Sequence, residues 1–305
     1  SWEIYKNYGR EKTGIEIIQD KSKELFKSNS KIKKIFEGCL WAEGPVFLKD
    51  ENLLVWSDIP FNRMLYFDIS NGKTGVFRNP SYFSNGNSVD LNGNQITAEH
   101  GRRGISQTNK NGEIKVIVDK FEGKRLNSPN DLVCKSDGTI WFTDPQYGIK
   151  TNYEGYQSES EIGFNGVYMI DNNNNLSLLT KEIDGPNGIA FSPDEKTLYV
   201  TDTETTGNIF SYKVSENKIF DKHVFATPRP GKPDGIKVDE YGNVFSSAWD
   251  GVQIFTPEGE LIAKIQIPEQ RTANLCFGGN EFNILFITSD KSLYTIEMNV
   301  KGNQN

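Results

Sequence analysis

One short motif returns six times along the sequence, and it constrains the fold more than any other feature. Each copy places an acidic or amide residue in a turn and leads through apolar residues into a strand. The oxygen-bearing residues are Glu43, Asn85, Asn130, Asn187, Asp234 and Asn274, at steps of 42, 45, 57, 47 and 40 residues. A period of about 40–50 residues is the length of one four-stranded propeller blade. If each copy begins a blade at a central channel, these side chains converge on one axis, as the oxygen ligands of a hard metal ion do.

Between the copies, short apolar strands alternate with turns that are rich in Gly, Asn and Asp. Clear examples are residues 53–58, 140–144 and 198–202, and each of these strands ends in an Asp. Evenly spaced strands of this kind are typical of an all-β barrel, sandwich or propeller. We therefore predict an all-β chain in which residues 31–305 form a single domain and residues 1–30 an N-terminal extension.

Three segments fall outside this regular pattern. Residues 16–26 have the character of a short helix. Residues 31–37 are predicted to form a strand that supplies the missing fourth strand of the last blade, which closes the ring and removes its free sheet edges. The third copy carries an insertion at residues 147–166, which we expect either as a lid over the channel mouth or as a surface loop elsewhere.

The charge balance excludes some classes of partner. The chain has 34 Lys and Arg against 41 Asp and Glu, so its net charge is −7 and its pI is about 5.1. An acidic protein of this kind is not expected to bind nucleic acid or an anionic membrane through its overall field. The sequence shows neither a membrane span nor a signal peptide. Because it starts at Ser1, a processed or trimmed N-terminus is open, and so is the choice between cytoplasm and periplasm.

Sulfur and nitrogen ligands for a metal are scarce. The three cysteines, Cys39, Cys134 and Cys276, form no CxxC pair and are expected as small buried residues. The chain has only two histidines, His100 and His223. Any bound metal should therefore be held mainly by oxygen.

Five segments in order, at blade spacing, resemble the senescence-marker-protein/gluconolactonase/luciferin-regenerating-enzyme family. They are WAEGPV at 41–46, LNSPNDL at 126–132, WFTDP at 141–145, PNGIAFSPD at 186–194 and PDG at 233–235. Two further segments, NGN at 85–87 and EHGRR at 99–103, are similar to the bacterial gluconolactonase branch of that family. The resemblance extends over roughly residues 35–298.

This resemblance implies a six-bladed β-propeller with four-stranded blades and one divalent cation in its central channel. Matched residue by residue, the cation ligands are Glu43, Asn187 and Asp234, and Asn130 takes the position beside the cation that reaches the substrate. We expect Asn130 also to contribute to the cation site. Ca²⁺ is the first candidate because it binds about 6–8 oxygen atoms; Zn²⁺, Mg²⁺, Mn²⁺ and Fe²⁺ remain open. Asp234, as general base, and Asn130 are the expected catalytic residues.

A sugar lactone also needs polar groups that bind its hydroxyls. The expected substrate-binding residues are Asn85, His100, Arg102, Arg103 and Asn274. The animal gluconolactonases of the family place an arginine two residues before the matched asparagine, and this chain has Ser128 there. We therefore expect Arg102 or Arg103 to substitute for that arginine.

Most of these residues also have a simpler interpretation. Asn-Gly and Asp-Gly pairs form turns without any ligand, and His100 fits a buried histidine whose hydrogen bonds are satisfied. Glu43 is the exception, because Glu is not a preferred turn residue. A further set of acidic residues at strand ends is expected to satisfy turns rather than to catalyse. This set is Asp58, Asp144, Asp202 and Asp290.

Three functions remain open from the sequence. The first is a metal-dependent hydrolase that opens sugar lactones to aldonic acids. The second is a phosphotriesterase-like hydrolase on the same scaffold. The third is a propeller that binds a ligand or a protein, with a metal that is purely structural. The sequence leaves the identity of the lactone and the oligomeric state undetermined.

Overall fold

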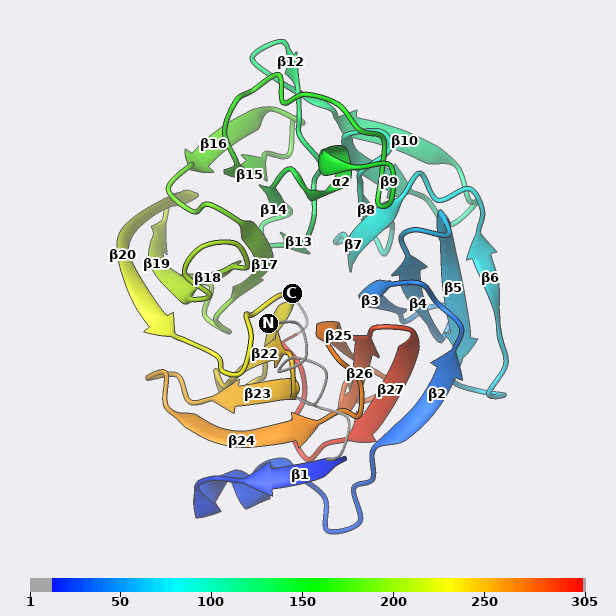
Figure 1. Ribbon diagram of the computed structural model, residues 1–305, viewed down its shortest axis with the longest axis vertical. Coiled ribbons are helices and arrows are strands. Elements are labelled where there is room, and N and C mark those ends of the chain that lie inside the picture. The colour runs from blue at the N-terminus through cyan, green and yellow to red at the C-terminus, as the bar shows by residue number, and fades with distance from the viewer. Residues whose placement is uncertain (1–12, 304–305) are drawn as a thin grey trace.

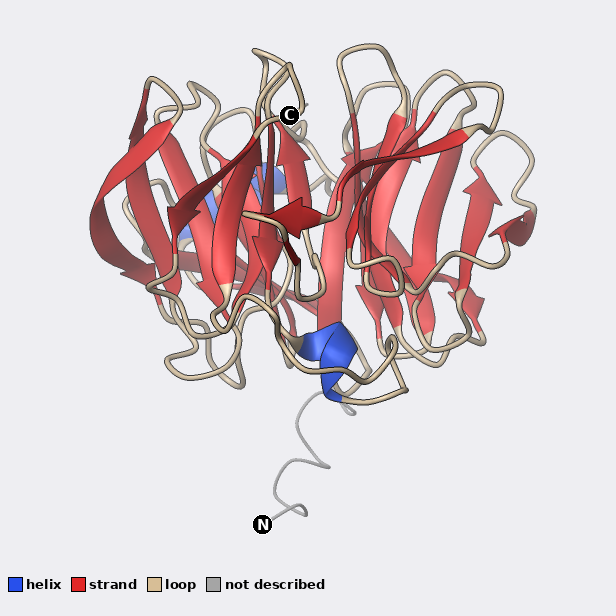
Figure 2. Ribbon diagram, turned by 90° about the horizontal axis from the view of Figure 1, so that it is seen from above, coloured by secondary structure: helices blue, strands red, loops and turns tan. Residues whose placement is uncertain are grey.

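The computed structural model describes residues 13–303 and is almost entirely β-structure. Six antiparallel sheets stand in a ring around a common axis, so the predicted six-bladed β-propeller with four-stranded blades is confirmed (Figure 1). Residues 1–12, which include the terminus expected to be processed or trimmed, lie outside the described residues. Figure 2 shows that the strands run between two faces, where the connecting loops lie.

Each blade is a meander whose first strand lies nearest the axis, and in blades one to four the fourth strand lies outermost. Blade one contains β3 (Ala42–Leu48), β4 (Leu53–Asp58), β5 (Arg63–Asp68) and β6 (Thr74–Arg78). Blade two contains β7 (Ser84–Val89), β8 (Gln95–Glu99), β9 (Gly104–Thr108) and β10 (Ile114–Val118). Blade three contains β13 (Leu132–Cys134), β14 (Ile140–Asp144), β15 (Gly166–Ile170) and β16 (Leu176–Thr180).

The second half of the ring repeats this order. Blade four contains β17 (Pro186–Phe191), β18 (Thr197–Asp202), β19 (Ile209–Ser215) and β20 (Lys218–Ala226). Blade five contains β21 (Ile236–Val238), β22 (Val244–Ala248), β23 (Gly251–Phe255) and β24 (Leu261–Gln266). Blade six contains β25 (Thr272–Gly278), β26 (Ile284–Ser289) and β27 (Ser292–Glu297) from the C-terminal region. A small hairpin, β11 (Lys120–Phe121) and β12 (Lys124–Arg125), lies between blades two and three.

The N-terminal part of the chain closes the ring. Strand β2 (Lys33–Glu37) pairs antiparallel with β27 and completes blade six, which confirms the predicted ring closure. The helix predicted at residues 16–26 is wrong at its start. Residues Gly14–Ile17 form strand β1, which adds a fifth strand to blade five against β24, and only Asp20–Leu25 form a short 3-10 helix, η1. Alternating Ile15 and Ile17 pack on the core between blades five and six, which favours a strand.

The core lies between neighbouring blades. Trp141 of blade three meets Phe191 of blade four edge to face, with ring centroids 5.0 Å apart, and Phe245 of blade five meets Phe277 of blade six at 5.2 Å. Such aromatic pairs add packing energy beyond the area they bury. All three cysteines are buried and unpaired, as predicted, although Cys39 lies outside a strand. Within residues 13–303, no helix has the length and apolar character needed to span a membrane.

The axis of the ring opens into a cavity of about 520 Å³ beyond the repeat residues. Its walls are mainly the later residues of the inner strands, among them Val46, Leu132, Ile189 and Phe277. The repeat residues Glu43, Asn130, Asn187 and Asp234 do not line this cavity. They lie at the start of the same strands, so the two ends of the channel have different chemistry.

Candidate functional site

Backbone hydrogen bonds between blades bring the repeat residues together. The Gly86 N–H donates to the Asn130 carbonyl at 2.7 Å, and the Gly188 N–H donates to the Asp234 carbonyl at 3.1 Å. Each bond joins the start of one inner strand to the start of the next. The repeat residues are therefore fixed around one axis by the backbone, as the repeat predicted.

Two glycines permit this close approach. A Cβ atom at Gly44 would lie 1.8 Å from the carbonyl oxygen of Asn85, and a Cβ atom at Gly188 would lie 2.2 Å from that of Asp234. Gly44 also has a φ of 49°, which L-residues with a side chain rarely adopt. The glycine that follows a repeat residue is thus needed for the ring to close at this radius.

Hydroxyl groups on the second strand of a blade fix the next blade's repeat residue. In each case the hydroxyl donates to the carbonyl oxygen of a repeat residue across the blade boundary. The pairs are Ser57 with Asn85, Thr143 with Asn187 and Thr201 with Asp234, each at 2.7 Å. The sequence shows these hydroxyls as Ser-Asp or Thr-Asp at strand ends, a signal that the sequence analysis did not use for the site.

The acidic residues after these three hydroxyls, and Asp290 after Ser289, have a structural role. Asp58, Asp144, Asp202 and Asp290 accept backbone N–H groups of Leu40, Asn127, Gly185 and Gln270 respectively. These donors lie just before the first strand of the same blade. The prediction that the strand-end acids satisfy turns is confirmed.

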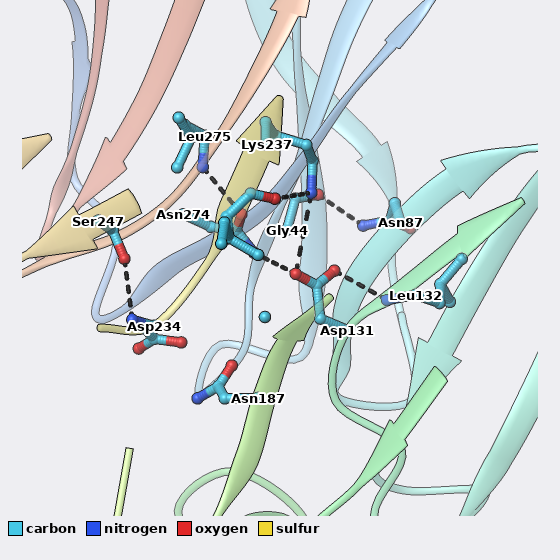
Figure 3. Close-up of polar contacts among 12 residues, drawn as sticks. Gly44, Asn87, Asp131, Leu132, Asn187, Asp234, Lys237, Ser247, Asn274 and Leu275 are labelled. Carbon is cyan, nitrogen blue, oxygen red and sulfur yellow. Dashed lines mark hydrogen bonds and ion pairs between the residues drawn. The ribbon is translucent and has the colours of Figure 1, made fainter. Parts of the chain in front are cut away.

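Four repeat residues carry an oxygen atom that has no hydrogen-bond partner among residues 13–303. We call them the free-oxygen group: Asn85, Asn130, Asn187 and Asp234, each through its Oδ1 atom. These oxygens are shielded from solvent, where an unmade hydrogen bond costs about 1–3 kcal/mol. Figure 3 shows the Asn187 and Asp234 side chains next to each other at this end of the channel. Buried oxygens without donors, drawn from several blades, are the donor set that a hard cation requires.

Glu43 adds a second carboxylate to this end of the channel. Its side chain is 2% exposed, and both of its hydrogen bonds, from Asn274 and from the Gly44 N–H, fall on Oε2. Burial, and next the charge of Asp131, raise the pKa of Glu43 to about 8. Burial and then the charge of Glu43 raise the pKa of Asp234 well above its usual value. Carboxylates crowded in this way favour a bound cation, because it would relieve both desolvation and repulsion.

His100 orients Asn85. Its Nδ1 lies 2.8 Å from the Glu154 carbonyl, which only accepts, so Nδ1 carries the proton. Its Nε2 therefore accepts from the Asn85 Nδ2, at 3.3 Å, and this leaves the Asn85 Oδ1 free. Burial lowers the pKa of His100 to about 4, so the ring is neutral. Both ring nitrogens have protein partners, and His100 positions Asn85 instead of offering the expected direct contact to a substrate.

Asn274 has a different environment from the other repeat asparagines. Its Nδ2 donates to Glu43 Oε2 at 2.9 Å and to Asp131 Oδ2 at 3.2 Å, and its Oδ1 accepts from the Leu275 N–H at 2.8 Å. Every hydrogen of the amide is used inside the protein. This arrangement does not support the expected contact of Asn274 with substrate hydroxyls, and it makes the residue a support for Glu43.

Asp131 and Lys237 complete this support, and sequence analysis missed both. The Lys237 ammonium lies 3.9 Å from Asp131 Oδ2, and Asp131 is 1% exposed (Figure 3). We call Asp131, Lys237 and Asn274 the support group. Lys237 follows the repeat residue of its blade by three positions and Asp131 follows Asn130 directly, so neither stands at a repeat position that would single it out.

The comparisons with known proteins identify the family of this chain. Residues 41–291 match the model of the SMP-30/Gluconolactonase/LRE-like region. The chain belongs to this family. It is 34% identical over 297 residues to a gluconolactonase from Zymomonas mobilis, covering 89% of this chain and 82% of that protein. A gluconolactonase structure from Xanthomonas campestris has a TM-score of 0.90 at 32% identity, covering 95% of this chain and 97% of the other. Diisopropyl-fluorophosphatase of Loligo vulgaris is 26% identical over 267 residues, covering 80% and 84%.

The two arginines proposed as substrate anchors in this family member have other partners. The Arg102 guanidinium donates to Glu99 at 3.2 Å and stacks on Tyr82, with 3.5 Å between its Cζ and the ring centroid. Arg103 is buried, and its Nε donates to the carbonyls of Leu126 and Asn127. The structure therefore does not bring either guanidinium together with the free-oxygen group. Ser128, at the position of the family's arginine, bonds to the backbone of Pro145 and Gly148.

The insertion at residues 147–166 reaches the site. It begins with the short helix α2 (Tyr147–Lys150), and the Glu154 carbonyl accepts the His100 Nδ1–H. The Glu154 carboxylate contributes to the raised pKa of both Glu43 and Asp234, and burial raises its own pKa to about 7. Of the two placements left open for the insertion, these contacts favour the lid. Because Glu154 lies in a polar insertion outside the repeat, nothing in the sequence indicates that it lies near the site.

Proposed function

We propose that this protein hydrolyses sugar lactones of the gluconolactone type, and that the reaction depends on one divalent cation, with Ca²⁺ as the first candidate. The observation that carries the proposal is the free-oxygen group, where buried oxygens from four blades lack partners beside two crowded carboxylates. The family and its gluconolactonase members support a lactone hydrolase as the enzyme class.

The donor set fits such a cation. Glu43, Asn187 and Asp234 would hold it, and Asn130 would lie beside it with its Oδ1 still available. When bound, the cation supplies a Lewis acid that polarises the lactone carbonyl and stabilises the oxyanion that develops on it. Waters and substrate oxygens would complete the coordination, because Ca²⁺ takes about 6–8 oxygens.

Asp234 is the proposed proton acceptor for the attacking water. The Asp234 Oδ1 is buried and has no hydrogen-bond partner among residues 13–303, and a bound cation would keep the carboxylate ionised, so it can accept the proton of a water at the cation site. The water oxygen bonds to the lactone carbonyl carbon, its proton passes to Asp234, and the ring carbon–oxygen bond breaks. Asp234 then returns this proton to the ring oxygen, and the product is an aldonic acid.

The remaining polar groups suit a hydroxylated substrate. The Asn85 Oδ1 is free to accept from a sugar hydroxyl because His100 holds the other end of the amide. The Asn130 amide offers a second such contact. A long acyl chain would need an apolar cleft to bury its tail, and an apolar ligand would leave these buried oxygens unpaired. We therefore expect a small polyhydroxylated lactone.

The test is kcat/KM for three substrate classes with chelator-stripped protein before and after addition of Ca²⁺. Gluconolactone or xylonolactone should be turned over fastest, only after the cation is returned. Faster turnover of a long-chain lactone would refute the sugar specificity. Full activity of the stripped protein would refute the cation dependence, and Zn²⁺, Mg²⁺, Mn²⁺ and Fe²⁺ should be added in parallel.

One alternative has support of its own. The likeness to diisopropyl-fluorophosphatase makes a phosphotriester-type substrate the second candidate. The same panel separates the two, because a triester that outcompetes the sugar lactones in kcat/KM would make this the better description. No turnover of any class, with a cation bound, would favour a binding protein with a structural metal.

A further inference from the structure

The Glu43 carboxylate is held from one side by a chain of three polar side chains. Glu43 Oε2 accepts from Asn274 at 2.9 Å, the same amide nitrogen donates to Asp131 at 3.2 Å, and Lys237 lies 3.9 Å beyond. These four residues come from four blades, since Glu43 lies in β3, Asn274 in β25, Lys237 in β21 and Asp131 directly before β13. Side chains of distant blades thus act on one carboxylate.

This chain fixes which oxygen of Glu43 stays available. An Asn amide can present either its oxygen or its nitrogen, and the oxygen would repel a carboxylate. Asp131 decides between them, because its carboxylate needs the same nitrogen and the Leu275 N–H needs the oxygen. Both hydrogen bonds to Glu43 then fall on Oε2, and its Oε1 is left for a ligand.

We infer that Asn274, Asp131 and Lys237 form a positioning relay that orients Glu43 for the cation. The inference rests on the cation site of the proposed function, and it assigns the support group no contact with substrate. Lys237 holds Asp131 against the repulsion of the other carboxylates, Asp131 orients the Asn274 amide, and the amide orients Glu43. Partners of this kind typically change metal affinity by about 10–100-fold when removed.

Calorimetric titration of Ca²⁺ into chelator-stripped protein tests the relay without any substrate. Asn274→Leu, which keeps the volume and removes both bonds, should raise the Kd by about 10–100-fold. Asp131→Asn, which keeps the shape, should raise it by about 10-fold. If either residue merely supported the fold, the Kd of the folded variant would stay at the wild-type value, and the inference would be overturned.

The double variant decides whether the residues act in series. Because Asp131 acts through Asn274, Asn274→Leu with Asp131→Asn should bind Ca²⁺ no more weakly than Asn274→Leu alone, within about threefold. Two independent effects would multiply instead and would contradict the relay. If Asn274→Leu does not fold, the pair Asp131→Asn and Lys237→Met replaces it, with the same expectation of non-additivity.

For Lys237→Met, the direction of the change in the Kd for Ca²⁺ distinguishes the relay from a purely electrostatic effect. If only the electrostatic field mattered, removing a positive charge near a cation site would tighten Ca²⁺ binding. The relay predicts weaker binding, because Asp131 would be repelled from the place where it orients Asn274. Lys264→Met is the matched control: Lys264 is also a lysine of blade five and also pairs with an aspartate, Asp250, at 2.8 Å, and its substitution should leave the Kd unchanged.

The outcomes separate this inference from the proposed function. A wild-type protein that binds no divalent cation would remove the cation site itself. A wild-type protein that binds Ca²⁺, with unchanged Kd values in Asp131→Asn and Lys237→Met, would remove the relay alone. At saturating Ca²⁺ the relay variants should keep kcat for gluconolactone within about threefold, since they act on Glu43 and not on the reacting atoms.

Discussion

Asn187 and Asn274 occupy the same position of the repeat, yet their side chains are in opposite states. Among residues 13–303, the buried Oδ1 of Asn187 has no hydrogen-bond partner, whereas the amide of Asn274 uses both hydrogens and its oxygen inside the protein. The free-oxygen group and the support group differ throughout in this way. The oxygens of the free-oxygen group are available to a ligand, whereas the polar atoms of the support group are bonded within the protein and hold their neighbours in place.

This difference distinguishes residues that bind a ligand from residues that position them, although both kinds occupy the same repeat position. A buried polar atom without a partner lowers the stability of the empty protein, so it persists where a ligand satisfies it. A polar group whose hydrogen bonds are all made within the protein instead fixes the positions of its partners. The two groups should therefore respond oppositely to substitution, in turnover, in cation affinity and in stability.

The largest expected difference is in turnover, between two aspartates in the same channel. Asp234→Asn should reduce kcat for gluconolactone by at least about 100-fold at saturating Ca²⁺, because a positioned general base contributes about 10²–10⁴-fold. Asp131→Asn makes the same chemical change next to Asn130 and should keep kcat within about threefold. Steady-state kinetics on both folded variants measure the contrast.

Unchanged turnover in Asp234→Asn would contradict the proposed difference between the two aspartates. Wild-type turnover in Asp234→Asn would remove Asp234 as both base and essential ligand. Circular dichroism and thermal melting of the two variants provide the control for folding, since Asp and Asn have nearly the same size.

The next effect is on cation affinity: substituting the ligand Glu43 should weaken binding more than substituting Asn274, which supports it. Glu43→Gln removes a charge in contact with the cation and should raise the Kd for Ca²⁺ by about 100-fold or more, because unit charges at ~4 Å near a protein surface interact by about 4 kcal/mol. Asn274→Leu should have a smaller effect. Titration calorimetry ranks the two, and a larger loss in Asn274→Leu would show that Glu43 is not the ligand.

The third effect is on stability and has a defined dependence on pH. The pKa of Glu43 is about 8 in the folded protein and about 4.5 in the unfolded chain, so the folded state binds the proton more tightly. Its contribution to stability is present below pH 4.5 and is lost as the pH rises through 8. The melting temperature of the cation-free protein should therefore fall between pH 5 and pH 9, and Ca²⁺ should restore it at the alkaline end.

Glu43→Gln is the control for this stability effect. It removes one titrating group and should make the pH dependence of the cation-free protein less steep, with a higher melting temperature than wild type at pH 9; Asp234 and Glu154, whose pKa values burial also raises, keep their contributions. Asn274→Leu should lower the melting temperature at each pH instead. If Glu43→Gln melted below wild type at pH 9, the crowded carboxylate would not be the source of the lost stability.

The sequence was sufficient to predict the ring and its oxygen-bearing residues, because both follow from a local motif repeated at blade spacing. The repeat by itself could not predict that Asn274 is fully hydrogen-bonded while the Asn187 oxygen is not, since that difference depends on which side chains other blades place nearby. Glu154 was missed for the same reason, as an insertion has no repeat to fix its position. Strand β1 was missed because Ile15 and Ile17 show an alternation too short to outweigh a helix-like segment.

The smallest expected effect concerns a residue that should bind substrate alone. Asn85→Leu removes a free oxygen that His100 presents to the site, and the loss of one hydrogen bond, worth about 0.5–1.5 kcal/mol, should raise the KM for gluconolactone by up to about tenfold. Its Kd for Ca²⁺ should stay at the wild-type value. Asn274→Leu should show the opposite pattern, with a weaker Kd and an unchanged KM once the cation is saturating. Weaker Ca²⁺ binding in Asn85→Leu would place Asn85 among the cation ligands, and the free-oxygen group would then act on the cation as a whole.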